Sequence, residues 1–259
     1  MRRSSDLILK HHGTRYTMDN IPYRPSGDER LDQMLAEAFQ TIGRGETIGV
    51  FQFESKGMQQ MLREMRPTRF EHIIAAVSLY RPGPMDFIPL YNRRMHGEEA
   101  ITFKHAKLEP ILSETYSIIV YQEQIMQIAS SLFGYSLGEA DTMRRAVSKK
   151  KKEDLLKHRQ KFIDQGPANG VNEETAAAIF DEIETFANYG FNKSHGADYA
   201  VISVQTAFLK THYGPEYMAA LLSTYFDDAA KVTAFLGECK RLDIPILPPD
   251  INASVLDFD

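Results

Sequence analysis

The sequence predicts a mainly α fold, with many helices and a few short strands. Apolar residues recur at spacings of three and four along most of the chain, β-like runs are few, and dense turn-forming segments separate the helical patterns. With 259 residues, 43% of them hydrophobic and 25% charged, the chain can bury a sizeable core. We therefore expect about eight to ten helices.

The individual elements are predicted from apolar periodicity and from end signals. Residues 13–29 are rich in proline, glycine and polar side chains, which indicates an irregular connection. Asn172 and Pro215 stand where a helix can begin. Short strands are expected at 47–53 and 244–247. The clearest helical patterns cover 31–43, 118–133, 173–188, 199–213, 215–225 and 229–242.

Composition favours a cytoplasmic protein. The single cysteine, Cys239, lies in a helix-like run, which indicates a buried packing role and suits a reducing compartment. No run approaches the roughly 18 apolar residues that span a bilayer, and the basic start lacks the apolar core of a signal peptide. We therefore expect no membrane partner.

The charge distribution points to phosphates although the net charge is −5. Between Arg144 and Lys161 there are nine Lys and Arg residues and only two acids. Such a local excess attracts polyanions whatever the total charge of the chain. The alternative is an ordinary solvated helical face.

The segment 190–199, GFNKSHGADY, stands at the start of a predicted helix. Backbone N–H groups and the dipole at a helix start favour an anion. Lys193 adds a positive charge and His195 a hydrogen-bond donor. The alternative is an ordinary cap, in which Asn192 or Ser194 accepts the backbone bonds.

Three further features accompany these segments. The run MRRAVSKKKK at 143–152 offers arginine forks and lysine point charges to phosphates. The run YQEQ at 121–124 places polar groups beside a buried stripe, and could also be an exposed first helical turn. Arg81 belongs to the stiff turn RPGP, which fits either presentation of this side chain or plain topology.

The sequence shows no catalytic or metal signature. It has no Cys/His zinc spacing, no HExxH motif and no Walker A loop. The closing run Asp257-Phe258-Asp259 resembles a two-metal carboxylate pair, but we interpret it as accidental. A stand-alone hydrolase is therefore poorly supported.

Six runs occur together in one order along the chain. They are GVFQFES (49–55), LYRPGP (79–84), YQEQIMQIA (121–129), GEADTMRRAVSKKK (138–151), YGFNKSHGADYA (189–200) and ILPPDIN (246–252). Together they closely resemble the fingers of the bacterial DNA polymerase III alpha subunit, a C-family replicative polymerase. The resemblance covers the chain from about residue 31 to 252.

This resemblance implies a fragment of a larger enzyme. Residues 1–30 would connect from the palm, 31–252 would form the fingers domain, and 253–259 would start the following segment. The palm aspartates and their Mg²⁺ would lie elsewhere in the parent, so we expect no catalytic residue, no metal and no cofactor on this chain, and no synthesis by the chain alone. The implied partners are primer–template DNA, a dNTP, other domains of the polymerase, the sliding clamp and further replisome subunits.

The resemblance also implies a set of residues that face the triphosphate and the nascent base pair. Supporting roles fall to Arg81, Gln122, Glu123 and Gln124. The positions expected to bind nucleotide or phosphate are Arg144, Arg145, Lys149, Lys150, Lys151, Asn192, Lys193, Ser194, His195 and Tyr199. Gly196, Ala197 and Asp198 depart from the usual Ser-Ala-Ala, which leaves the detailed roles open.

A second function remains open from the sequence. The chain could be a non-catalytic helical module for nucleic-acid binding or assembly that uses the run 144–161 on phosphate backbones. Such a module would bind DNA with a steep salt dependence and would ignore nucleotides.

Overall fold

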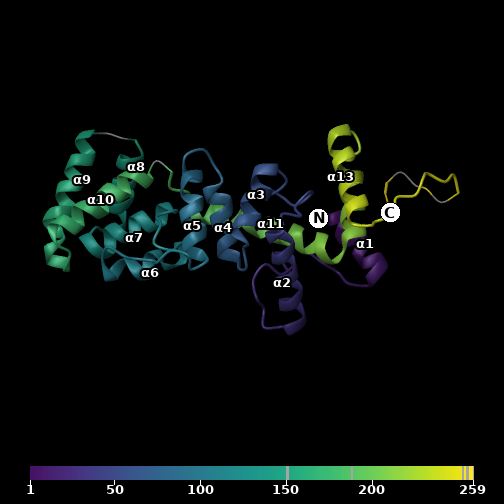
Figure 1. Cartoon of the computed structure of the whole chain (residues 1–259), viewed down its shortest axis with the longest axis horizontal. Coiled ribbons are helices and arrows are strands. Elements are labelled where there is room, and N and C mark those ends of the chain that lie inside the picture. Colours follow the sequence, from purple (N-terminus) through teal and green to yellow (C-terminus); the bar gives the residue numbers. More distant parts are fainter. Residues whose placement is uncertain (150–151, 188, 253, 255–256, 259) are drawn as a thin grey trace. The chain divides into compact units, whose positions relative to one another are not determined.

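The computed structural model describes residues 1–149, 152–187, 189–252, 254 and 257–258. Its described residues form thirteen α-helices, α1 to α13, together with four short 3-10 helices (Figure 1). The predicted mainly α class is confirmed, although the helices outnumber the eight to ten expected because several have only one to three turns. No helix in the described part of the chain has the length and apolarity to cross a bilayer.

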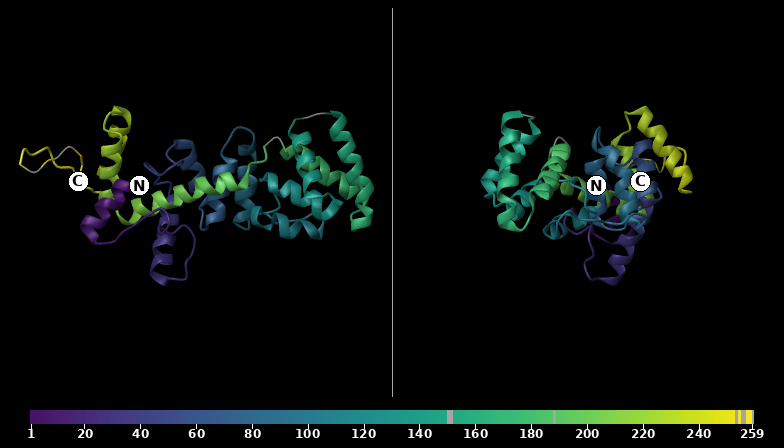
Figure 2. Two further views of the ribbon diagram at one scale, coloured as in Figure 1. Left: turned by 180° about the vertical axis from the view of Figure 1, so that it is seen from behind. Right: turned by 60° about the vertical axis from the view of Figure 1, so that its left-hand side comes forward.

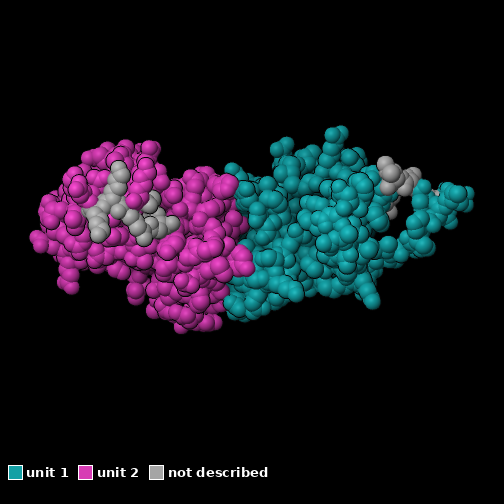
Figure 3. Space-filling model, turned by 90° about the horizontal axis from the view of Figure 1, so that it is seen from above, with its two compact units in different colours: residues 1–73, 198–259 teal, residues 74–197 magenta. Residues whose placement is uncertain are grey.

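The chain divides into two compact units, coloured separately in Figure 3. Unit 1 contains Met1–Ile73 and Asp198–Asp259, and unit 2 contains Ile74–Ala197. Helices α4 (Phe70–Leu79) and α11 (Lys193–His212) each contribute residues to both units. The predicted division into a connecting segment at 1–30 and a domain at 31–252 stays a prediction.

Unit 1 is built around an aromatic and aliphatic core. Phe208 of α11, Tyr217 of α12 and Phe235 of α13 are among its buried members, and Cys239 lies with them as predicted. Helix α1 packs against α12, α12 against α13, and α2 against α3. The other helices of this unit are α1 (Arg2–His12), α2 (Glu29–Gly43), α3 (Lys56–Met65), α12 (Gly214–Thr224) and α13 (Ala229–Arg241).

Unit 2 has its own core, in which α8, α9 and α10 pack against one another and against α7 (Figure 2). The rings of Phe133 and Phe162 stack with centroids 3.8 Å apart, and Phe180 meets Phe162 edge-on. The helices are α5 (Ile88–Met95), α6 (Glu109–Leu112), α7 (Gln122–Phe133), α8 (Leu137–Ser148), α9 (Lys152–Gln165) and α10 (Glu173–Ala187). The 3-10 helices are η1 (Pro84–Phe87), η2 (Ala106–Leu108), η3 (Ser113–Thr115) and η4 (Pro167–Asn169).

The helix starts predicted at Asn172 and Pro215 are confirmed. The side chain of Asn172 accepts a hydrogen bond from the backbone N–H of Thr175 at the start of α10. Pro215 lies in the first turn of α12, where a missing N–H costs nothing. The carboxylate of Asp228 caps α13 by accepting from the N–H of Lys231.

The two predicted strands are wrong. Residues 47–53 form consecutive turns, in which the N–H of Val50 donates to the carbonyl of Thr47 and the N–H of Phe53 to that of Val50. Positive φ angles at Gly49 and Gln52 bend the backbone away from an extended path. Residues 244–247 are irregular, because Pro245 and the following prolines remove backbone donors that a strand needs.

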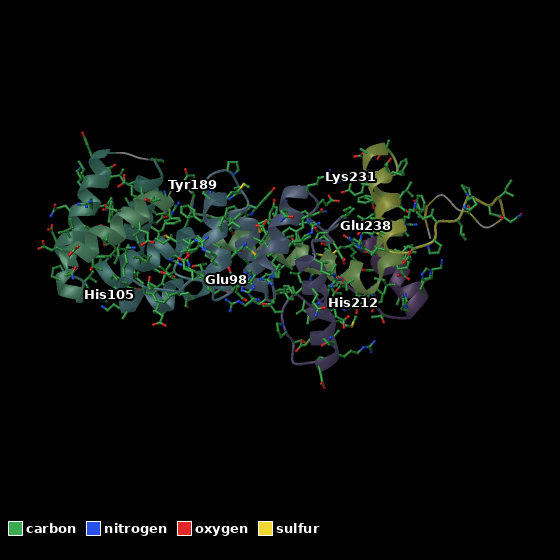
Figure 4. All side chains as sticks on the ribbon, viewed as in Figure 1. Glu98, His105, Tyr189, His212, Lys231 and Glu238 are labelled. Atoms are coloured by element: carbon green, nitrogen blue, oxygen red, sulfur yellow. The ribbon has the colours of Figure 1, made fainter. Side chains whose placement is uncertain are left out.

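Unit 1 buries one lysine completely. The ammonium of Lys210 on α11 donates to the carbonyls of Glu46 and Ile48, each at 2.7 Å, and to the carboxylate of Glu238. Glu238, labelled in Figure 4 on α13, also accepts from Arg241. Burial lowers the pKa of Lys210, and the pairing with Glu238 opposes that shift. This cluster ties the turn at 46–48 to two helices.

The start of α8 is joined to α9 through Glu139. Its carboxylate accepts from Lys161 at 2.8 Å and from the backbone N–H and hydroxyl of Ser136. Lys161 in turn lies 4.0 Å from the ring centroid of Tyr135. The hydrogen bond from Lys161, together with those from Ser136, lowers the pKa of Glu139 to about 2.

Replacing Glu139 with glutamine is expected to destabilise the chain at neutral pH and to matter less in acid. The folded pKa lies below the ordinary value of 4.5, so the stabilisation is present above about pH 4.5 and is lost as the pH falls toward 2. Urea unfolding at pH 6 and pH 3 measures this, with the exposed Glu174→Gln as the control. A difference between wild type and Glu139→Gln that is the same at both pH values would contradict the account.

Candidate phosphate-binding site

Arg144 from the first cationic segment and residues 190–193 from the second lie beside the start of α7, within unit 2. An isolated parallel β-bridge pairs Tyr121 with Phe191. The N–H of Gln122 donates to the carbonyl of Phe191 at 2.9 Å, and the N–H of Phe191 donates to the carbonyl of Val120 at 3.0 Å. The predicted helix at 118–133 therefore begins only at Gln122, because Tyr121 is extended and residues 118–120 are not helical.

Gln124 has a structural role. Its side-chain oxygen accepts from the backbone N–H groups of Val120 and Tyr121, and its amide nitrogen donates to Thr115 and to the carbonyl of Ile111. The side chain is buried, and three of the four bonds form away from solvent. Gln124 thus holds the extended segment before α7 in place.

Gln122 connects the two cationic segments. Its side-chain oxygen accepts from the guanidinium of Arg144 at 3.2 Å, and its amide nitrogen donates to the carbonyl of Gly190 at 3.1 Å. The backbone of Gly190 comes close as well, since a Cβ at that position would lie 3.2 Å from the Cγ of Gln122. A single side chain therefore touches both α8 and the segment before α11.

Arg144 and Arg145 share one carboxylate on α8. Nε and Nη2 of Arg144 donate to Oδ1 of Asp141, and Nη2 of Arg145 lies 2.6 Å from Oδ2. The hydrogen bonds from Arg144 and Arg145 lower the pKa of Asp141, which keeps it ionised at neutral pH. The Arg144 side chain is 19% exposed and that of Arg145 is 65% exposed, so Arg145 is the more open of the two.

The start of α11 is occupied by groups of the chain itself. The side chain of Asn192 accepts from the N–H of His195, which is the ordinary cap that the sequence left as an alternative. Both carboxylate oxygens of Glu123 lie 3.1 Å from the N–H of Lys193. The negative charge at this helix end is thus the side chain of Glu123.

The side chain of Lys193 is held by a carboxylate from a distant part of unit 2. Its ammonium lies 2.8 Å from Oε2 of Glu114 and 5.3 Å from the ring centroid of Tyr121. Lys193 therefore forms an ion pair with Glu114. Both members of the pair remain about one third exposed, so solvent and ligands can reach them.

Arg81 is fixed near the same segment. It donates to the carbonyls of Ser78 and Tyr189, each at 2.8 Å, and its guanidinium lies 4.4 Å from the ring centroid of Phe191. Tyr189, labelled in Figure 4, also packs against Gly83 of the RPGP turn, where a Cβ would lie 2.2 Å from its ring. Burial lowers the pKa of Arg81, but an arginine stays charged at neutral pH.

The remaining predicted residues are less closely connected. Lys149 is exposed just after α8, and Ser194 and His195 are exposed on the first turn of α11. The His195 ring lies 5.6 Å from that of Phe191. Tyr199 belongs to unit 1, where its ring lies 5.5 Å from that of Phe51. Lys150 and Lys151 lie outside the described residues.

The sequence did not single out the two carboxylates that pair with the cations. Asp141 could have been found, because it precedes Arg144 and Arg145 by three and four residues on a helix. Glu114 gives no local signal, since its partner lies 79 residues further along the chain. Among the described residues, no group of three or more His, Cys, Asp or Glu side chains could hold a metal ion.

The described residues form a helical domain in which cations from three segments gather beside the start of α7. The chain belongs to the family described as the bacterial DNA polymerase III alpha subunit finger domain, whose model matches residues 1–170. It is 55% identical over 235 residues to the DNA polymerase III subunit alpha of Thermus aquaticus, which covers 89% of this chain and 19% of the relative.

Two further relatives agree with this assignment. The DNA polymerase III subunit alpha of Chlamydia muridarum is 52% identical over 85% of this chain and 18% of its own length. That of Escherichia coli strain K12 is 46% identical over 86% of this chain and 20% of its own length. The chain thus spans about a fifth of the length of the relatives that it matches.

Proposed function

We propose that the chain is the fingers part of a DNA-directed DNA polymerase of bacterial chromosomal replication. In this role unit 2 holds the triphosphate of an incoming dNTP, and the basic run after Arg144 contacts primer–template DNA. The catalytic aspartates and their Mg²⁺ belong to the palm of the parent protein, which would also bring the clamp and the other replisome subunits. The proposed setting is the bacterial cytoplasm.

One observation carries the proposal. Cations from three separate segments, Arg81, Arg144 and Lys193, are anchored around the same short stretch at Tyr121–Glu123 and its neighbour Phe191. Arginine binds phosphate oxygens as a fork and lysine as a point charge, so such a set fits a polyphosphate better than a single anion. In a polymerase, these charges would stabilise the transferring group and the leaving pyrophosphate.

The carboxylates in the site are expected to lower its affinity for a triphosphate. Asp141 and Glu114 pair with three of the cations in the absence of a ligand. A triphosphate must compete with them, because each cation can give its strongest bonds to only one partner at a time. We therefore expect weak nucleotide binding by the chain alone.

The alternative of a DNA-binding module without nucleotide specificity rests on the cations that continue along α9, of which Lys157 is exposed and Arg159 and Lys161 are partly exposed. A titration with dATP, with a DNA duplex, and with both together separates the two functions. The polymerase proposal expects saturable dATP binding, whereas the alternative expects binding of DNA only. Failure of dATP to bind at millimolar concentrations would contradict the proposal.

Reversing the charge of Lys149 is expected to weaken duplex binding and to reduce its salt dependence. Each lost phosphate contact lowers the slope of log K against log salt by about one. Binding of a 20-base-pair duplex at several salt concentrations measures the slope for Lys149→Glu. Lys240→Glu, an exposed lysine of unit 1, is the control. An unchanged slope in Lys149→Glu would show that Lys149 does not contact the DNA phosphates.

A further inference from the structure

We propose that Gln122 is a positioning residue that fixes the guanidinium of Arg144 against the segment 190–195, so that the two cationic segments bind one triphosphate together. This inference rests on the proposed function, because it concerns the same site. It goes further by assigning the coupling between the segments to one side chain.

The contacts of Gln122 are divided between the two segments. One end of its amide accepts from Arg144, and the other end donates to the carbonyl of Gly190. Its backbone N–H donates to the carbonyl of Phe191, which fixes the position from which the side chain extends. The side chain is only partly buried, so it lies at the edge of the site and not in the core.

An amide is the group that this position requires. An acceptor must face the Arg144 guanidinium and a donor must face the Gly190 carbonyl, and a glutamine supplies both at the end of one side chain. A glutamate would pair with Arg144, but its second oxygen would face the carbonyl of Gly190 without a proton to donate. A methionine has a similar length and lacks both groups.

Among the described residues, the side chains next to Gln122 make other contacts. Gln124 has its hydrogen bonds inside the core, with Thr115 and the backbone before α7. Glu123 contacts the backbone N–H of Lys193. Asp141 holds Arg144 from its own helix and so cannot relate it to the 190–195 segment.

The bridge gives Arg144 a defined place in the site. Asp141 fixes one side of the guanidinium through Nε and Nη2, and Gln122 accepts from Nη1 on the other branch. With both in place the planar group has one orientation. A triphosphate that spans Arg144 and Lys193 then meets cations that are already placed, and less conformational entropy is lost on binding.

The test is a double-mutant cycle on the whole chain with dATP as the probe. Gln122→Met, Arg144→Met and the double variant are titrated by NMR. We expect Gln122→Met to weaken dATP binding about tenfold, and to add little once Arg144 is already methionine, because it acts through that residue. Gln127→Met, at an exposed position of the same helix, is the control and should bind as wild type.

A second measurement tests the positioning of Arg144 without any nucleotide. The Nε–H signal of Arg144 is expected to shift and broaden in Gln122→Met but not in Gln127→Met, since only the first loses the acceptor at Nη1. An unchanged Arg144 signal, or fully additive losses in the cycle, would overturn the inference even if dATP binds. If wild type fails to bind dATP while the Arg144 signal changes as expected, the proposed function fails and the positioning of Arg144 by Gln122 stands.

Discussion

Replacing Lys193 with methionine is expected to weaken dATP binding by roughly tenfold or more. Replacing Glu114 with glutamine is expected to strengthen it. The two changes have opposite signs because Glu114 neutralises the same ammonium that the triphosphate would use, at 2.8 Å in the structure. Isothermal titration or NMR titration with dATP at constant salt measures both affinities.

A matched ion pair elsewhere in unit 2 supplies the controls. Lys104 and Glu182 lie 3.1 Å apart and have similar exposure, but neither is among the residues of the site. Lys104→Met and Glu182→Gln change the net charge of the chain by the same amounts as the two test variants. If Lys104→Met weakens binding as much as Lys193→Met does, the effect is one of overall charge, and the proposed site is wrong.

Replacing Lys210 with methionine is expected to cost about 3–5 kcal/mol of unfolding free energy, as for other broken buried ion pairs. The change leaves the carbonyls of Glu46 and Ile48 without their shared donor, and Glu238 without one of its two cationic partners. Urea unfolding followed by circular dichroism measures the loss. Lys240→Met, at an exposed position of α13, should stay within about 0.5 kcal/mol of wild type.

A second variant tests whether the loss comes from the unpaired charge. In Lys210→Met combined with Glu238→Leu, both charges of the buried pair are removed, and well-packed apolar pairs are often no less stable than buried ion pairs. We expect part of the stability to return. A cost below about 1 kcal/mol for Lys210→Met alone would show that the buried cluster does not hold the turn at 46–48.

Local pattern was enough to predict the fold class and most helices. Helices α10, α12 and α13 follow the predicted ranges closely, because their periodicity and caps lie within the segments themselves. Local sequence pattern gave wrong predictions where a segment pairs with residues that are distant in the sequence. Tyr121 is extended and not helical because Phe191 pairs with it from about seventy residues away. The run 47–53 has the composition of a strand, but positive φ angles at Gly49 and Gln52 turn it.

The cations of the candidate site could be predicted from the sequence, but the hydrogen bonds and ion pairs that join them could not. Charge and helix-end chemistry single out Arg144 and Lys193 from the sequence alone. The hydrogen bonds that join them through Gln122 and Glu123, and the competing carboxylate of Glu114, depend on tertiary packing that no local pattern encodes. The roles of individual residues toward dNTP and DNA stay predictions.

A nucleoside triphosphate is expected to bind in unit 2, where the start of α7 meets α8 and the start of α11. NMR mapping of backbone amides during a dATP titration tests it most directly. We predict saturable shifts that gather at 122–123, 144–145 and 190–195. Shifts that gather in unit 1, or an absence of saturable shifts at millimolar dATP, would contradict the claim.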